Sequence, residues 1–460
     1  MSRGKRKTDW RQIIGRRAIV RGLLFALAVA WPVFSPSLSP VAPESFQSSA
    51  ESDAAAVSTS THEGRMAVFD DVWSTISVRY YDHSFNALAN GLTWETQRST
   101  FRALAAETNS GQELYVVLRR MVASLKDPHT RVFSPAEKFD WWRPRSVTIG
   151  LMVREVGGFP TVFNVERGSE PQRAGIVPGD VIEAVDDQPA LLLVQRTLSD
   201  SVGQGASARF RAFARFIDGP PESIVEIRWK GKDGKKKSAQ FTRYWQQREL
   251  GLRVRRERGD FAIVELDAFT SQISQRFAVA LKEKLTDVRG IILDLRGNGG
   301  GDAEAMTDVA SAFLRAGLSL GRFIDRSGTS FSIATRRKSP LIPDRLTQTN
   351  LPLVILTSER TSSAAEIFIA GLRASRRATI IGAQTCGCVL AIRARHELPD
   401  GGLLDVSELD YQTAAGERLE KKGIKPDETV VVQRNDLYAG HDRAMELAIN
   451  RLKTLRTAQR

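Results

Sequence analysis

Apolar residues recur at helical spacing in two segments near the start of the chain. In residues 67–81 and again in residues 114–125 they return every three or four positions, which is the pattern of an amphipathic helix. A polar loop with an Asn-Gly pair at residues 90–91 separates the two segments. Pro128 follows the second segment and disfavours helix in the residue before it. The pattern predicts a helical domain in residues 66–144.

Further along the chain the pattern changes to short β-rich runs separated by turns. Residues 170–190 indicate a short helix, a turn, a strand and a second turn, and residues 191–216 have a helix-like pattern. A Lys-rich hairpin tip at residues 230–237 is expected to be solvated. We predict one β-rich domain in residues 145–246. Its strands are expected in residues 147–153, 161–165, 223–229 and 238–243.

From about residue 247 to the end, predicted strands alternate with predicted helices. Residues 290–296 form a continuous apolar run, which is typical of a strand buried on both faces. The alternation predicts an α/β core in residues 247–460. The other expected strands are 261–267 and 353–358, and the expected helices are 271–285, 302–316, 363–374 and 443–455.

Residues 1–35 have the pattern of an export signal. Residues 1–22 carry eight basic residues against Asp9, and a short apolar run follows at residues 22–34. Such a run is too short to span a membrane and suits the apolar region of a signal peptide. Residues 36–65 are rich in Ser, Pro and Ala and are expected to be a flexible linker. We predict export to the bacterial periplasm. An uncleaved anchor, with inner-membrane association, is the alternative, since no clear cleavage site follows the run.

The composition excludes some classes of partner. Of the 460 residues, 42% are hydrophobic and 26% are charged, as in an ordinary globular protein. The formal net charge is +13, but the basic head, residues 1–22, accounts for +7 and the large remainder for only +6. A surplus of that size indicates a mildly basic surface and no nucleic-acid partner.

The chain has two cysteines, Cys386 and Cys388, which excludes a disulfide scaffold. With one residue between them, the geometry for a mutual disulfide is expected to be poor. Three interpretations stay open: small packing residues, redox-sensitive thiols, or metal ligands together with His396. Because no fourth ligand is evident, we predict no metal site, and we predict no cofactor.

A run of glycines follows the predicted buried strand and precedes a helix. Gly299, Gly300 and Gly301 can expose successive backbone N–H groups beside a helix N-terminus, an arrangement that binds negative charge. The surrounding residues match neither a phosphate-binding P-loop nor a dinucleotide-binding fingerprint. An oxyanion hole uses the same physics.

A second turn from strand to helix carries Ser363. A serine at such a turn can expose its hydroxyl next to the backbone N–H of the following residue, Ala364. Ser362 or Ser363 could instead cap the helix, which is a common role for serine in this position. His129, which follows the predicted helical segments, indicates little on its own.

As an ordered set, five segments resemble peptidase family S41, the C-terminal-processing and tail-specific proteases. They occur in family order between about residues 66 and 432. The resemblance implies an α/β multi-domain protein with an N-terminal helical domain (66–144), a PDZ domain (145–246) and a crotonase- or ClpP-like α/β catalytic core (247–460). The segments are Asp127-Pro128-His129-Thr130, Gly150-Leu151 with residues 174–182, and residues 294–301, 361–367 and 419–428.

The resemblance also implies roles for single residues. The loop Ile149-Gly150-Leu151-Met152 would receive the C-terminal carboxylate of a substrate, whose tail would pair as an added strand. Ser363 would attack the scissile carbonyl and form an acyl-enzyme. Backbone N–H groups of Ala364, Gly299 and Gly300 would hold the oxyanion. The implied partners are proteins or peptides with accessible C-termini.

The chain departs from the processing proteases of this family in the residues that activate the serine. Those enzymes use a lysine, but 25 residues after Ser363 this chain has Cys388 instead. Ile392 stands where a glutamine would support that lysine. A thiol is a poor substitute, because its ordinary pKa of about 8.5 rises further on burial.

A second branch of the family, similar to tricorn-type and chlamydial proteases, uses a histidine as the base. That histidine corresponds to His129, and its acid partner corresponds to Glu420, with Glu417 as the substitute. The prediction is a triad of Ser363, His129 and Glu420. The alternative is a catalytically inactive S41-like protein that binds peptides or ligands. The missing lysine favours that alternative, whereas the serine turn, the glycine turn and His129 favour the enzyme.

Overall fold

The computed structural model describes residues 57–85, 93–137, 140, 143–200, 206–257, 261–285, 287–336 and 351–458. The predicted signal segment and most of the predicted linker lie outside these ranges, so both stay predictions. Residues 55–460 form one compact unit. Among the described residues, no helix combines the length and the apolar character that crossing a membrane requires.

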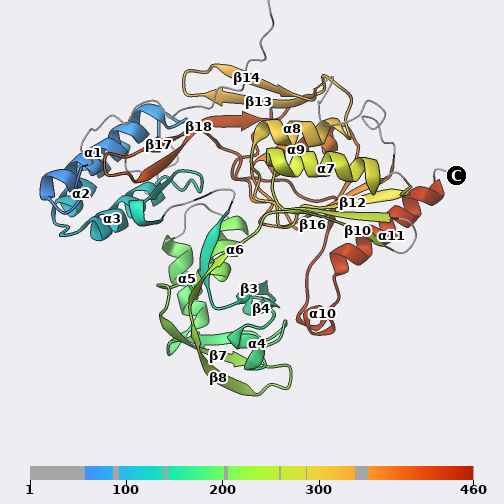
Figure 1. Ribbon diagram of the computed structural model, residues 1–460, viewed down its shortest axis with the longest axis horizontal. Helices are drawn as coiled ribbons and strands as arrows, with labels where there is room; N and C mark the ends of the chain where they lie inside the picture. The colour runs from blue at the N-terminus through green and yellow to red at the C-terminus, as the bar shows by residue number, and fades with distance from the viewer. Residues whose placement is uncertain are drawn as a thin grey trace, which may run out of the picture. The chain divides into compact units, whose positions relative to one another are not determined.

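The second half of the chain is built on a six-stranded sheet with the order β10-β11-β12-β15-β16-β19 (Figure 1). β10 is antiparallel to β11, and every following pair is parallel. Parallel neighbours need crossover connections, and in the first three of these pairs the connections contain the helices α7, α8 and α9. The predicted mixed α/β fold is confirmed. The strands are β10 (Leu252–Glu257), β11 (Phe261–Leu266), β12 (Gly290–Asp294), β15 (Leu353–Thr357), β16 (Thr379–Gly382) and β19 (Glu428–Thr429), and the helices are α7 (Ser271–Glu283), α8 (Ala303–Ser311) and α9 (Ala364–Ala374).

Both faces of this sheet are buried, as the apolar run in residues 290–296 predicts. On β12, Ile291 and Leu293 pack in the same cluster as α7, α8 and α9, whereas Ile292 packs against α11 (Arg443–Ala458) on the opposite face. In the parallel register Asp294 of β12 pairs with Leu356 of β15. The turns that follow these two strands therefore lie next to each other at the carboxyl end of the sheet.

A second, five-stranded sheet was not predicted. It has the order β1-β18-β13-β14, and β17 also pairs with β18. β18 is buried over most of its length, but β14 and β17 contain no buried residue. Such short polar runs give a weak strand signal. The strands are β1 (Arg131–Phe133), β13 (Ser319–Asp325), β14 (Ser330–Ala334), β17 (Ala391–Glu397) and β18 (Leu403–Gln412).

The N-terminal helices α1 (His62–Arg79), α2 (Trp94–Ala106) and α3 (Gly111–Ala123) share a core with this sheet, to which Leu404 and Val406 of β18 contribute. α2 corrects the expected loop between two helices. Thr93 caps this helix, and the ring of Trp94 stacks on Trp73 with 4.3 Å between the ring centroids. This buried aromatic contact stabilises a helix that the polar sequence does not indicate.

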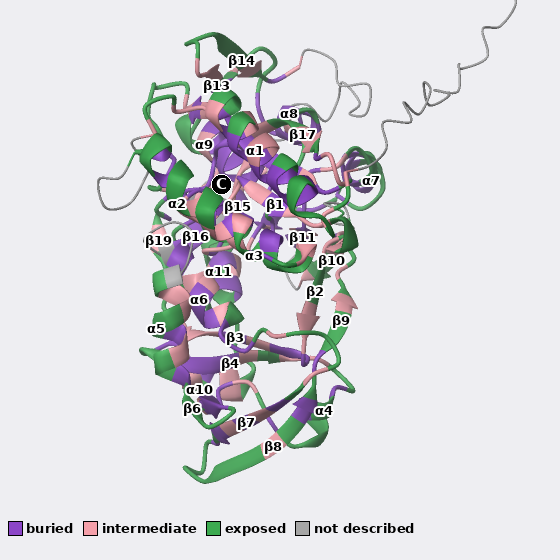
Figure 2. Ribbon diagram, turned by 90° about the vertical axis from the view of Figure 1, so that its left-hand side faces the viewer, coloured by how far each residue is buried: buried purple, intermediate pink, exposed green. Residues whose placement is uncertain are grey.

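A β-rich module has the sheet order β3-β4-β5-β7-β8, with β6 paired to β5. Gly150, at φ +86°, divides the single strand expected in residues 147–153 into β2 and β3. The expected helix 191–216 is two helices, α5 and α6. The Lys-rich tip of the β7–β8 hairpin and most of β8 are exposed, as expected for the tip (Figure 2), whereas β7 buries every second residue. The elements are β2 (Arg145–Thr148), β3 (Leu151–Val156), β4 (Phe159–Val165), α4 (Glu170–Arg173), β5 (Val181–Val185), β6 (Gln188–Pro189), α5 (Ala190–Asp200), α6 (Ala206–Arg215), β7 (Ile224–Lys230), β8 (Lys236–Thr242) and β9 (Tyr244–Gln247), which pairs with β2.

Candidate active site

Ser363 lies in the turn between β15 and α9, at the carboxyl end of the sheet, where the glycine run also lies. Its backbone has φ +58° and ψ −127°. A residue other than glycine rarely adopts a positive φ, and such strain concentrates at functional sites. Ser363 occupies the N-cap position of α9, and its N–H donates to the Oε2 of Glu366 at 3.2 Å, which is one half of a capping box. The capping interpretation of Ser363 therefore holds for its backbone, and the strained turn is the feature that a cap alone does not explain.

Gly300 packs directly against Ser363. A Cβ atom at position 300 would lie 2.6 Å from the Cβ of Ser363 and 3.0 Å from the backbone nitrogen of Ala364, so only glycine fits. The N–H of Gly300 donates a 2.8 Å hydrogen bond to the Oδ1 of Asn298 and is therefore already engaged. Within the described ranges, the N–H groups of Gly299 and Ala364 make no hydrogen bond. These two donors remain free beside Ser363.

Asn298 holds the glycine turn in place, and its role was not predicted. The residue is fully buried, and its Nδ2 donates to the carbonyl oxygen of Leu266 at 2.9 Å. Its own carbonyl oxygen accepts the N–H of Ser362 at 3.1 Å. Asn298 thus ties the glycine turn to β11 on one side and to the turn that carries Ser363 on the other. A polar side chain inside a buried glycine motif was the signal that could have identified it.

Glu366, in the first turn of α9, holds the loop that follows β16. Its carboxylate accepts the N–H groups of Gly387 at 2.8 Å, Cys388 at 3.0 Å and Ser363 at 3.2 Å, and also the hydroxyl of Thr385. The side chain is fully buried. Burial raises the pKa of Glu366 to about 7, against the lowering effect of these hydrogen bonds. This carboxylate joins the turn that carries Ser363 to residues 385–388.

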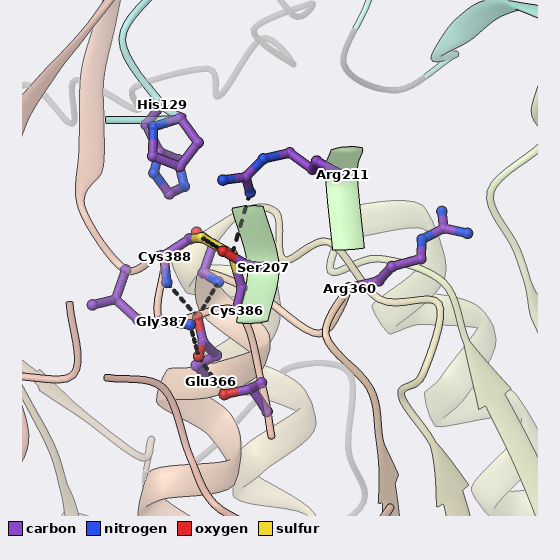
Figure 3. The surroundings of a disulfide bond; sticks show 12 residues. His129, Ser207, Arg211, Arg360, Glu366, Cys386, Gly387 and Cys388 are labelled. Carbon is purple, nitrogen blue, oxygen red and sulfur yellow. Dashed lines mark hydrogen bonds between the residues drawn. A yellow bond between two sulfur atoms is a disulfide. The ribbon is translucent and has the colours of Figure 1, made fainter. Parts of the chain in front are cut away.

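Cys386 and Cys388 form a disulfide, with 5.2 Å between their Cα atoms (Figure 3). The expectation of poor geometry for a mutual bridge is therefore wrong. Gly387 between them adopts φ +68°, which lets the chain fold back tightly enough for the two sulfurs to meet. The carbonyl oxygen of Cys388 accepts the N–H of Ser363 at 2.8 Å. Cys388 thus lies beside the serine, as its spacing predicted, but carries no free thiol.

The metal-ligand interpretation of the cysteines finds no support in this arrangement. Their sulfurs bond to each other, and the Nε2 of His396 lies 3.2 Å from the Oε1 of Glu408. Across the described residues there is no group of three or more His, Cys, Asp or Glu side chains that could hold a metal ion.

His129 lies in the turn between α3 and β1. Its backbone N–H donates to the Oδ1 of Asp127 at 2.9 Å, and its Nδ1 lies 3.8 Å from the same oxygen. That Nδ1 is buried and has no hydrogen-bond partner. Burial lowers the pKa of His129 to about 4, although Asp127 acts in the opposite direction. The imidazole is therefore neutral at pH 7, which is the form that can accept a proton.

The predicted triad is not assembled in this structure. No hydrogen bond joins His129 to Ser363, Glu420 or Glu417, all of which are described residues. Glu420 instead accepts the N–H groups of Val389 at 2.8 Å and Leu390 at 3.3 Å. Burial raises the pKa of Glu420 to about 8. Glu417, the substitute candidate, is exposed to solvent, so it lacks the buried surroundings of Glu420.

Comparison with known proteins decides the family. Residues 260–430 match the model of peptidase family S41. These residues therefore form an S41 peptidase domain. Members of the family are serine-type hydrolases, so the chain is a serine-type peptidase.

The relatives of this S41 peptidase carry names that refer to C-terminal processing. It is 29% identical to carboxyl-terminal-processing peptidase 2 of Arabidopsis thaliana, a chloroplastic protein, over 78% of this chain and 68% of the relative. It is 27% identical to the carboxyl-terminal-processing protease of Synechocystis, over 78% of this chain and 79% of the relative. In both cases most of the S41 peptidase is aligned, including segments outside residues 260–430.

Solved structures have the same fold. The photosystem II D1 C-terminal processing protease is 25% identical, with a TM-score of 0.50, over 80% of this chain and 93% of that one. Mature CPAF is 13% identical, with a TM-score of 0.65, over 85% of this chain and 96% of that one. The second likeness concerns the fold alone.

In this S41 peptidase the predicted carboxylate loop lies between β2 and β3. Ile149 is buried, and Gly150 donates its N–H to the Oγ1 of Thr148 at 3.0 Å. Leu151 and Met152 begin β3, the end strand of its sheet. α6 lies against β3, and Arg209 of α6 forms an ion pair with Glu155 of β3. The loop therefore leads into a strand whose free edge is close to a helix.

Proposed function

We propose that this S41 peptidase is an exported endopeptidase that recognises C-terminal or unstructured peptide tails and cleaves them through an acyl-enzyme on Ser363. The observation that carries the proposal is the contact of Gly300 with Ser363, which leaves two free N–H groups beside a strained serine. The names of the relatives support the substrate class. The basic head and apolar run of residues 1–34 support export.

In the proposed mechanism the Ser363 hydroxyl attacks the scissile carbonyl, and the negative charge that develops on its oxygen is held by the N–H groups of Ala364 and Gly299. Both donors belong to turns at strand ends, so they need little reorganisation during the reaction. Gly300 serves by leaving room, because its own N–H is bonded to Asn298. The scissile C–N bond then breaks, and the downstream peptide leaves as an amine that takes up a proton. Water hydrolyses the remaining acyl-enzyme and frees the serine.

We assign proton transfer to His129. The imidazole is neutral at pH 7, and its Nδ1 has no other hydrogen-bond partner. Asp127, 3.8 Å from that Nδ1, can orient the ring without a rearrangement. Glu420 accepts the N–H groups of Val389 and Leu390 through its Oε2 and makes no hydrogen bond to His129. The present arrangement is a resting state, and substrate binding brings His129 to Ser363.

We further propose that residues 145–246 are a PDZ domain, and that Ile149-Gly150-Leu151-Met152 receives the terminal carboxylate of the tail. β3 lies at the end of its sheet, so its free edge can pair with an extended peptide. α6 packs on β3, so it lies next to the strand that would receive the tail. This feature links recognition of the tail to the helix that also faces the active-site loop.

The test uses an unfolded protein that carries a C-terminal tag. Wild-type peptidase should shorten this substrate, and Ser363→Ala should not, although it should still bind the tail. His129→Ala should lose most of the activity. If the wild type binds the tail and cleaves no faster than Ser363→Ala, the peptidase proposal fails in favour of a binding protein. If Ser363→Ala is inactive and His129→Ala is fully active, the assignment of the base fails.

A further inference from the structure

The Cys386–Cys388 disulfide holds the nucleophile turn at two points. The N–H of Cys386 donates to the carbonyl oxygen of Thr361 at 2.9 Å, and the carbonyl oxygen of Cys388 accepts the N–H of Ser363 at 2.8 Å. These contacts lie on either side of Ser362. The bridge holds the two cysteine Cα atoms 5.2 Å apart. It therefore also fixes the spacing between the Cys386 N–H and the Cys388 carbonyl oxygen, the two groups that bind the turn.

The other side of the disulfide faces α6. The Nη1 of Arg211 lies 4.0 Å from the Sγ of Cys386, and the Oγ of Ser207 lies 4.0 Å from the Sγ of Cys388 (Figure 3). A guanidinium next to a sulfur stabilises a thiolate, and a hydroxyl can donate to one. Both sulfurs therefore have a group beside them that favours the anion formed when the bridge opens.

The two cysteine residues differ in exposure. Cys388 is 5% exposed, whereas Cys386 is only partly buried. An attacking thiol therefore reaches Cys386 before Cys388. A bridge enclosed in the core would offer no such access, so accessibility and charge both point to a disulfide that can react.

We propose that Cys386–Cys388 is a redox site that exchanges with dithiol reductants, and that its oxidised form keeps Ser363 in the geometry of the working enzyme. One thiolate of the dithiol attacks the Sγ of Cys386, the S–S bond breaks, and Cys388 leaves as a thiolate that then takes up a proton. The second thiolate of the dithiol attacks its own sulfur in the mixed disulfide, and Cys386 leaves beside Arg211. The protein gains two electrons, and the dithiol becomes a disulfide.

The effect on activity rests on the proposed function. In the reduced protein the two cysteines that bind the nucleophile turn are no longer linked to each other, although Glu366 still binds the loop. A small displacement of a nucleophile can cost roughly 100-fold in rate, so we expect peptidase activity to fall by about tenfold or more. The fold should persist, because the parallel sheet is buried on both faces independently of the bridge.

The redox site is tested first without reference to peptidase activity. The full chain is equilibrated in mixtures of reduced and oxidised dithiothreitol, its thiols are alkylated, and the added groups are counted by intact mass. We expect two alkyl groups on a protein with an unchanged circular dichroism spectrum. Arg211→Gln should shift the equilibrium at least threefold towards the disulfide, or ~15 mV, because it destabilises the Cys386 thiolate.

Arg215→Gln is the matched control, since it removes the same charge from the same helix at a residue that pairs with Asp218. It should leave the equilibrium unchanged. Folded wild-type protein that stays oxidised in excess dithiothreitol would overturn the proposal. Equal shifts in the Arg211 and Arg215 variants would overturn the assigned role of Arg211.

The second arm measures cleavage of the tagged substrate by oxidised, reduced and reoxidised wild type and by the double variant Cys386→Ser, Cys388→Ser. Activity should fall on reduction and return on reoxidation, and the double variant should match the reduced rate with or without dithiothreitol. Equal rates in both redox states would overturn the link to Ser363. If neither the oxidised nor the reduced protein cleaves the substrate, the proposed function has failed. The thiol titration then still shows whether Cys386–Cys388 is a redox site. If the double variant does not fold, the comparison of oxidised, reduced and reoxidised wild type alone tests the link between the disulfide and activity.

Discussion

The backbone N–H of Ser363 donates a 2.8 Å hydrogen bond to the carbonyl oxygen of Cys388, 25 residues further along the chain. The family resemblance implies a lysine base at the position of Cys388, and the structure places that position next to the serine. The Cys388 side chain is committed to a disulfide and can take no proton from the serine. The base must therefore come from another element, and His129 is the histidine that the family's second branch implies.

Replacing Gly300 with alanine should abolish peptidase activity and destabilise the fold by about 2 kcal/mol or more, because the new Cβ would collide with Ser363 in a backbone conformation that suits glycine. Urea unfolding and a cleavage assay measure the two effects. Gly317→Ala is the control: Gly317 also has a positive φ, but nothing lies within 4 Å of its added Cβ. That variant should lose about 1 kcal/mol of stability and keep its activity. Equal activity of the two variants would contradict the contact.

Replacing Ser363 with glycine should raise stability while removing activity. Ser363 holds φ +58° and ψ −127°, a conformation that costs residues other than glycine roughly 1–3 kcal/mol. Ser363→Gly should therefore exceed Ser363→Ala in free energy of unfolding by about 1 kcal/mol, after the greater entropy of glycine in the unfolded chain is subtracted. Chemical denaturation of the two variants checks this. An alanine variant as stable as the glycine variant would show that the turn stores no strain.

Two carboxylates compete for the role of orienting His129, and a pair of variants separates them. Asp127→Asn should lower kcat by about 10- to 100-fold with little change in KM, because Asp127 is the carboxylate next to the imidazole. Glu420→Gln keeps an oxygen that can accept the N–H of Val389, so we expect a loss of less than about fivefold. The pH profile of kcat should shift in the first variant only. The reverse order of effects would return the role to Glu420.

Stability should fall as the pH rises from 6.5 to 8. Burial raises the pKa of Glu366 to about 7 and that of Glu420 to about 8, from an ordinary value of 4.5. A carboxyl with a raised folded-state pKa contributes stability that is complete below its unfolded-state pKa and is lost as the pH rises through the folded-state value. His129, with a folded-state pKa near 4, is already neutral in the folded protein, and the unfolded state, whose pKa is 6.5, loses its remaining proton in this interval, which adds back only about 0.4 kcal/mol.

The two carboxyls together should cost about 2 kcal/mol over this interval. Urea denaturation at several pH values measures the slope, and the double variant Glu366→Gln, Glu420→Gln should flatten it. A wild-type stability that is level or rises between pH 6.5 and 8 would show that both carboxyls are already ionised in the folded protein.

Much of the catalytic half could be predicted from the sequence, because its strands are buried on both faces and therefore read as unbroken apolar runs. The run in residues 290–296 and the serine turn at Ser363 both lie where the pattern places them. The second sheet could not be predicted in this way. β17, for example, presents mostly exposed or partly exposed residues, so no apolar periodicity marks it.

The finer parts of the candidate site depend on contacts between residues that are distant in sequence. Glu366 and Gly387 meet only because β16 returns the chain beside α9, and no local pattern marks the glutamate as a ligand for that loop. The disulfide is a similar case. Spacing alone disfavours it, and the positive φ of Gly387, which permits it, is set by packing against residues 421–423.

The central claim, that Ser363 is the nucleophile, is tested most directly by covalent labelling. The oxidised peptidase is incubated with a fluorophosphonate and digested, and the modified residue is located by mass spectrometry, with Ser363→Ala treated in parallel. The account predicts one phosphonylated residue, Ser363, no label in the alanine variant, and loss of cleavage in proportion to the label. A label on another residue, or cleavage by Ser363→Ala at the wild-type rate, would contradict it.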